Sequence, residues 1–239
     1  LHQKRELAEK LHFQAMHDAL TQLPNRSLLM DRLQHTLQVY RRRNTEPRIH
    51  FSLLFLDLND FKIINDTFGH EAGDELLVIV ADRLQGSLRE MDTVARLGGD
   101  EFVVIIEEIT GEYDAIEVAN RIHSTFADPV DLNGEVVKIS TSIGIVLNSP
   151  DYNYPEEMLR DADIAMYEAK RNGLNRLCFI LRCRLMKRYQ PNPMLKKILA
   201  KGNINGKCQS FSLIDINLKH EIFLFSGSSI LPCLFSLQS

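Results

Sequence analysis

Two adjacent glycines followed by two adjacent carboxylates, Gly98-Gly99-Asp100-Glu101, constrain the fold of this chain more than any other feature. Alternating apolar residues before and after them, in DTVARL and FVVIIE, predict two β-strands. The glycine pair predicts the tight turn of a β-hairpin, because glycine adopts positive φ readily and lets a ligand approach the backbone closely. Carboxylates at the tip of such a hairpin are suited to hold a hard cation beside that ligand.

The remaining apolar patterns predict an α/β (α+β) domain with a mixed central sheet flanked by helices. The run IHFSLLFLDL (49–58) is continuously apolar and ends in an acid, which is typical of a central strand buried on both faces. Asn133-Gly134 is a hairpin-turn signal. We predict helices over 1–17, 26–43, 72–84, 113–127 and 155–172, a short helix that ends at Gly69, and further strands over 137–147 and 176–181.

The composition predicts a folded globular protein, since 44% of the 239 residues are apolar and 25% are charged. A net charge of −4 gives no reason to expect nucleic acid as a partner. Four cysteines without a CxxC pair suggest neither a disulfide framework nor a zinc site, so we expect a cytoplasmic domain. The chain begins with Leu1 rather than Met, and we expect an upstream sensor domain and, in the full-length protein, a possible membrane anchor.

The string GGDEF, together with four other motifs in order over residues 17–181, resembles the GGDEF family of diguanylate cyclases. The resemblance implies a fold like that of nucleotidyl cyclases and polymerase palm domains. It implies that two GTP molecules are condensed into cyclic di-GMP and two pyrophosphates by a homodimer, with inhibition by the product. Residues 1–17 then correspond to a signalling linker helix, 18–181 to the catalytic domain and 182–239 to a tail.

The resemblance also implies a metal site for Mg²⁺, with Mn²⁺ as an alternative. Its ligands are Asp57, the backbone carbonyl of Leu58, Asp100 and Glu101, and Glu101 is expected to activate the attacking 3′-hydroxyl. Two metal ions stabilise the attacking and the leaving oxygens of such a displacement. The simpler interpretation, that Asp100 and Glu101 are only polar turn residues, does not account for Asp57 at the end of a strand.

For the nucleotide, the resemblance implies that Asn65 and Asp74 recognise guanine. A carboxylate accepts hydrogen bonds from N1–H and from the exocyclic amine of guanine. Structural roles for both residues are also open, Asn65 as a helix C-cap and Asp74 near a helix N-terminus. The remaining substrate-binding residues that the resemblance implies are Lys62, Lys170, Gly98 and Gly99.

One departure from the family pattern leaves the activity open. The family carries K-x-x-G-R-N where this chain has Lys170-Arg-Asn-Gly-Leu174-Asn, and leucine cannot make a charge-assisted bond to phosphate. Arg171 or Arg176 could replace the missing arginine. The alternative function is therefore a catalytically weak module that senses GTP or cyclic di-GMP. A nucleotidyltransferase acting on nucleic acid shares the two-metal chemistry, but the net charge and the lack of a basic, aromatic strip disfavour it.

Arg89-Glu-Met-Asp92 is an RxxD motif shortly before the glycine pair. At this offset the resemblance implies a site for inhibition by the product, where Arg89 binds a phosphate or a guanine edge and Asp92 completes the contact. Arg121, on the next predicted helix, is a candidate for a second contact.

The C-terminal region differs from the rest in charge. Between Ala169 and Ile214 there is no Asp or Glu, whereas eleven Lys or Arg residues occur. The segment FSLIDINLKHEIFLFSGSSIL resembles the opening strands of an EAL-type phosphodiesterase domain, but it lacks the metal-binding glutamate that hydrolysis requires. We therefore expect a basic tail that is either poorly folded or the truncated start of such a domain.

Overall fold

The computed structural model describes residues 2–42, 50–171, 177–182, 211–216 and 222–226. The helices are α1 (His2–Met16), α2 (Arg26–Arg42), α3 (Phe61–Phe68), α4 (His70–Gly86), α5 (Glu112–Phe126) and α6 (Pro155–Arg171). The strands are β1 (His50–Leu58), β2 (Thr93–Gly98), β3 (Glu101–Ile109), β4 (Val130–Leu132), β5 (Glu135–Val137), β6 (Thr141–Leu147), β7 (Leu177–Arg182), β8 (Phe211–Ile216) and β9 (Ile222–Ser226).

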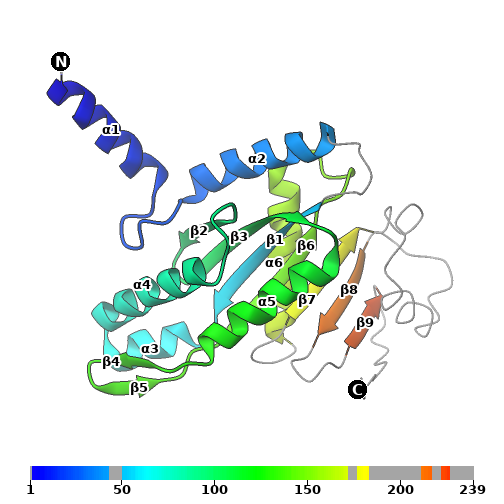
Figure 1. Ribbon diagram of the computed structural model, residues 1–239. Helices are drawn as coiled ribbons and strands as arrows, with labels where there is room; N and C mark the ends of the chain where they lie inside the picture. Colours follow the sequence, from blue (N-terminus) through cyan, green and yellow to red (C-terminus); the bar gives the residue numbers. More distant parts are fainter. Residues whose placement is uncertain (1, 43–49, 172–176, 183–210, 217–221, 227–239) are drawn as a thin grey trace.

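A mixed seven-stranded sheet forms the centre of the molecule, with helices on both faces (Figure 1). Its strand order is β2-β3-β1-β6-β7-β8-β9, in which β6 and β7 are parallel and the other neighbouring pairs are antiparallel. This arrangement confirms the predicted fold class. The helix α1 projects away from the body of the molecule, as Figure 1 shows.

The central strand β1 is buried from Phe51 to Leu58 because both of its faces are covered. Its odd-numbered apolar residues, Phe51, Leu53 and Phe55, pack in one core with α2 and α6. Its even-numbered residues pack in a second core with α4 and α5. Strand side chains alternate between faces, so a strand covered on both sides must be apolar throughout, as the sequence predicted.

The helix α6 approaches the sheet very closely at Gly144 of β6. A Cβ atom placed on Gly144 would lie 2.2 Å from both the Ala162 carbonyl oxygen and the Met166 nitrogen. Only glycine allows this contact, and a larger residue would push the helix away from the strand. The close packing brings the polar side chains of α6 to the end of β1.

The predicted strand over 137–147 is wrong in its first part. Asn133 and Gly134, both at positive φ, form the predicted turn, but it joins β4 and β5 in a separate two-stranded sheet. The strand β6 begins only at Thr141, because its partner β1 ends at Leu58. The residues of the predicted strand that precede Thr141 have no strand in the central sheet to pair with.

Beyond β7 the sheet continues into the region that we predicted to be a basic tail. The strand β8 pairs with β7, and β9 pairs with β8. Both strands fall in the segment whose sequence resembles opening strands of a second domain. The remainder of the predicted tail lies outside the described residues, so its boundary at 181 stays a prediction. In the described part of the chain, no helix combines the length and hydropathy needed to cross a membrane.

Candidate functional site

The end of β1 meets the β2–β3 hairpin, and this brings two of the predicted metal ligands together. Asp57 lies directly opposite Glu101 on β3 and opposite Ser142 on β6. Residues directly opposite in an antiparallel pair project from the same face, with Cβ atoms roughly 5 Å apart. Both carboxylates therefore lie on the face of the sheet that α6 covers.

The other two predicted ligands come from the adjoining backbone and turn. Gly99 and Asp100 form the turn of the hairpin, with Gly98 at φ 145° and Gly99 at φ 51°, where other residues would be strained. The Leu58 amide donates to the Asp100 carbonyl oxygen at 3.4 Å, so the turn lies against the end of β1. The Leu58 side chain is buried in the opposite core, which leaves only its backbone to face a ligand.

The helix α6 contributes one residue that we predicted and one that we missed. Lys170 Nζ lies 2.5 Å from Asp57 Oδ1, so the lysine expected to bind phosphate is paired with an expected metal ligand. Asp163 interacts electrostatically with Asp57 and Glu101. The sequence could have indicated Asp163 by its spacing of seven residues from Lys170, because residues two helical turns apart lie on one face of a helix.

Burial and mutual repulsion raise the pKa values of these acids. Burial raises the pKa of Asp100, the charge of Asp57 raises it further, and Lys170 opposes the change. Burial likewise raises the pKa of Glu101, followed by the charges of Asp163 and Asp100. The pKa of Asp163 is raised by burial and then by Asp57. Groups that repel one another in this way gain from a cation placed between them.

The donor set fits a magnesium ion in its chemistry. Mg²⁺ prefers oxygen ligands and needs only one or two carboxylates, because it retains water and substrate phosphates. The predicted ligands Asp57, Asp100 and the Leu58 carbonyl have the oxygen chemistry that this ion prefers. Among the described residues, no three acidic, histidine or cysteine side chains converge as a complete metal site.

The two predicted guanine-binding residues lie on α3 and α4, the two helices that meet at Gly69. A Cβ atom on Gly73 would lie 1.9 Å from Asn65 Oδ1, so the amide of Asn65 occupies the space beside Gly73. Asp74 follows that glycine directly and is exposed. The possible C-cap role of Asn65 is wrong, because α3 ends at Gly69, whose amide donates to the Asn65 carbonyl oxygen at 2.9 Å. Lys62 is exposed in the first turn of α3.

The three residues of the predicted inhibitory site lie around the turn between α4 and β2. Asp92 Oδ2 accepts from the Arg89 amide at 2.9 Å, and Oδ1 accepts from the Glu107 amide at 3.2 Å. Arg121 Nε donates to the Ser87 carbonyl oxygen at 2.7 Å, which holds α5 against the same turn. Arg89 itself is exposed. Leu174, the departure from the family pattern, lies outside the described residues.

Comparison with known proteins identifies the family. Residues 15–176 match the family model described as the diguanylate cyclase GGDEF domain. Two relatives from Pseudomonas aeruginosa are each 44% identical: the bifunctional diguanylate cyclase/cyclic di-GMP phosphodiesterase MucR over 165 residues and the diguanylate cyclase TpbB over 164 residues. These matches cover 69% and 68% of this chain but only 23% and 37% of the relatives.

Solved structures of GGDEF domains have the same fold. The GGDEF domain of TpbB from Pseudomonas aeruginosa matches with a TM-score of 0.62 and 43% identity, covering 66% of this chain and 91% of that one. The coiled coil and GGDEF domain of DgcB from Caulobacter crescentus, in complex with c-di-GMP, matches with a TM-score of 0.66 and 26% identity. The second match covers 74% of this chain and 91% of that one.

Proposed function

The chain belongs to the GGDEF-domain family of diguanylate cyclases, and from that premise we propose that residues 18–181 condense two GTP molecules into cyclic di-GMP. The observation that carries this proposal is the strand register that sets Asp57 opposite Glu101, beside the Gly99-Asp100 turn. In the reaction, the 3′-oxygen of one nucleotide forms a bond to the α-phosphorus of the other. The bond from that phosphorus to pyrophosphate breaks, and two such steps close the ring.

The acidic end of the sheet provides the groups for this displacement. Asp57, Asp100, Glu101 and the Leu58 carbonyl would hold Mg²⁺ or Mn²⁺, and two such ions supply the charge that stabilises the attacking and leaving oxygens. Glu101 accepts the proton of the 3′-hydroxyl at its carboxylate. Burial and then the charge of Asp163 raise the pKa of Glu101 when no cation is bound, whereas a bound cation would lower it again.

The remaining predicted residues bind the nucleotide. Asn65 and Asp74 would select guanine, since the Asn65 amide lies beside Gly73 and Asp74 follows that glycine on α4. Lys170, which pairs with Asp57, would contact a phosphate of the nucleotide. Lys62 and the Gly98-Gly99 backbone complete the contacts to the triphosphate.

We further propose that the active species is a homodimer. One domain carries a single hairpin and a single set of nucleotide residues, whereas the product joins two nucleotides. The product would inhibit by binding Arg89, with Asp92 and Arg121 in support, because Arg89 and Asp92 share one turn and Arg121 of α5 donates to that turn. The alternative is a catalytically weak module that senses GTP or cyclic di-GMP, which Leu174 favours.

Incubation of the purified chain with GTP and Mg²⁺, followed by chromatography of the products, tests the proposal. We expect cyclic di-GMP and pyrophosphate, at a rate per chain that rises with protein concentration, and no product from ATP. An Asp100→Asn variant is the control for contaminating activity. Binding of GTP without product would instead identify the sensing module, and extension of an oligonucleotide would identify a polymerase-like enzyme.

A further inference from the structure

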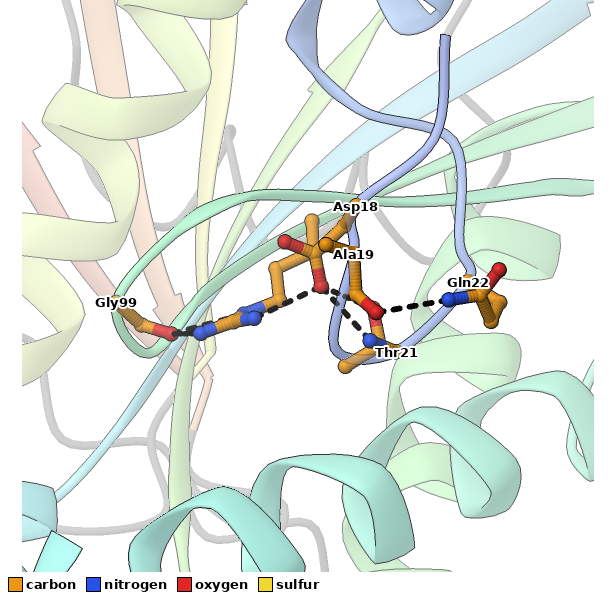
Figure 2. A network of polar contacts seen from close by, with 6 residues as sticks. Asp18, Ala19, Thr21, Gln22 and Gly99 are labelled. Atoms are coloured by element: carbon orange, nitrogen blue, oxygen red, sulfur yellow. Dashed lines mark hydrogen bonds and ion pairs between the residues drawn. The ribbon is translucent and has the colours of Figure 1, made fainter. Parts of the chain in front are cut away.

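A buried arginine donates hydrogen bonds to the backbone of the hairpin turn. Arg96 on β2 is only 9% exposed, and its guanidinium donates to the Gly99 carbonyl oxygen from Nε at 3.0 Å and from a terminal nitrogen at 2.8 Å. The other terminal nitrogen donates to Asp18 Oδ1 at 2.8 Å. Figure 2 shows Gly99 on one side of this guanidinium and Asp18 on the other.

The carboxylate of Asp18 is itself held in place. Its Oδ1 accepts from the Thr21 amide at 2.9 Å and from the Thr21 hydroxyl at 2.7 Å, within the loop seen in Figure 2. Burial raises the pKa of Asp18, but these bonds and the bond from Arg96 outweigh it and lower the pKa. The carboxylate is therefore a charged, fixed partner for the arginine.

The same loop is bonded to the end of α1. The Asn25 amide donates to the Met16 carbonyl oxygen at 2.9 Å, and Asn25 Nδ2 donates to the Ala15 carbonyl oxygen at 2.8 Å. The Arg96 amide donates to the Pro24 carbonyl oxygen at 2.9 Å. Arg96 thus joins the segment leaving α1 to the hairpin turn through both its backbone and its side chain.

The contact with Gly99 bears directly on the acidic site. The Gly99 carbonyl and the Asp100 nitrogen belong to one planar peptide unit. Two hydrogen bonds to this carbonyl therefore fix the orientation of the peptide that leads into Asp100. Arginine can make both bonds and still reach a carboxylate because its donors form a rigid planar fork, whereas lysine is a point charge.

From these contacts we propose that Arg96 is a positioning residue, which sets the place of the Asp100 carboxylate relative to the segment leaving α1. This inference rests on the proposed metal-binding role of Asp100. Arg96 does not touch the substrate in this scheme. It acts through the Gly99–Asp100 peptide, and its positive charge, which Arg96→Lys retains, also interacts with Asp100.

The test compares Arg96→Lys with a matched control, Arg83→Lys. Arg83 also donates to backbone carbonyls, those of Asp128 at 2.6 Å and Pro129 at 3.0 Å, but it lies on α4 away from the hairpin turn. Mn²⁺ binding is measured on the full 239-residue chain from the paramagnetic resonance signal of the free ion. Melting temperature and cyclic di-GMP formation at varied Mn²⁺ are measured on the same samples.

For Arg96→Lys we expect the half-saturating Mn²⁺ concentration to rise about tenfold, the effect of losing one charge-assisted hydrogen bond. Product formation should recover at high Mn²⁺. For Arg83→Lys we expect a lower melting temperature with unchanged Mn²⁺ binding. Asp18→Asn keeps the shape of the side chain but removes its charge, so it should raise the Mn²⁺ requirement in the same direction. In the double variant with Arg96→Lys it should raise the Mn²⁺ requirement little further, because both changes disrupt the same Arg96–Asp18 contact.

Unchanged Mn²⁺ binding in Arg96→Lys would overturn the inference while leaving the proposed function intact. An equal rise in Arg83→Lys would also overturn it, since the effect would then follow from general destabilisation. If Arg96→Lys does not fold, Asp18→Asn takes its place, and unchanged Mn²⁺ binding in that variant would overturn the inference. Failure of the wild-type chain to bind Mn²⁺ would overturn both the inference and the metal site on which it rests.

Discussion

The two faces of the central sheet place ionisable groups in different surroundings. On the face covered by α2 and α6, the acids Asp57, Glu101 and Asp163 gather at the end of the strands, where Lys170 and solvent screen them. On the face covered by α5, His123 is buried at 6% exposure, and its Nε2 donates to the Thr141 carbonyl oxygen at 3.0 Å. Burial lowers the pKa of His123 to about 4.

The difference shows how position decides the charge state of a group. Repelling carboxylates are tolerated at the ends of the strands, because water reduces their interaction. An imidazole inside a helix–sheet interface has no such relief and stays neutral at pH 7. The first face is therefore suited to bind a charged ligand, and the second makes the stability of the fold depend on pH.

The largest expected effect is on the acidic face, at Glu101. Glu101→Gln should reduce the rate of cyclic di-GMP formation by about 10²-fold or more, because an amide cannot accept the proton of the 3′-hydroxyl. GTP binding, measured by calorimetry, should change little. A variant that forms product at nearly the wild-type rate would remove Glu101 from the proposed chemistry.

The buried face is tested by His123→Leu. The pKa of His123 is depressed by burial, so its contribution to stability is fully present above about pH 6.5 and is lost as the pH falls through about 4. The free energy of unfolding of the wild type should therefore fall, relative to that of the variant, by about 3 kcal/mol across that window. Urea unfolding at several pH values measures the difference. Parallel pH profiles for the two proteins would show that His123 does not titrate on unfolding.

A third prediction concerns the turn between α4 and β2, where β2 is the edge strand of the sheet opposite to β9. Arg89→Ala should weaken the binding of cyclic di-GMP about tenfold without lowering the initial rate, since one guanidinium–phosphate contact is lost. Arg160→Ala, an exposed arginine on α6, serves as the control. Equal calorimetric affinity for cyclic di-GMP in the wild type and in Arg89→Ala would place the inhibitory site elsewhere.

The smallest expected effect is on stability at Asp163. Asp163 is exposed, but the partial loss of its hydration and then the charge of Asp57 raise its pKa, so its charge opposes folding at neutral pH and this cost disappears as the pH falls through the raised pKa. Asp163→Asn should therefore raise the melting temperature at pH 7, with a gain that shrinks in acid. Asp82→Asn, an exposed acid on α4, should leave the melting temperature unchanged. A gain that is independent of pH would contradict the electrostatic explanation.

Several elements could be predicted because their signals are local. The apolar run before Asp57 predicted β1, and the glycine pair predicted the hairpin of β2 and β3, since side-chain alternation and turn preferences depend on neighbours in sequence. The extent of β6 could not be predicted, because its start at Thr141 depends on where β1 ends. Asp163 was missed because its role depends on how closely α6 packs on Gly144.

By itself, the sequence determined the types of the elements and the family motif, and from that motif it predicted oxygen ligands for a cation. Only the tertiary structure decided that Asp57 lies opposite Glu101, that Lys170 pairs with Asp57, and that Arg96 joins Gly99 to Asp18. These contacts join residues far apart along the chain, and their geometry is set by strand register and by helix packing. Register and packing follow from the burial of both faces of the sheet at once, which no local pattern in the sequence specifies.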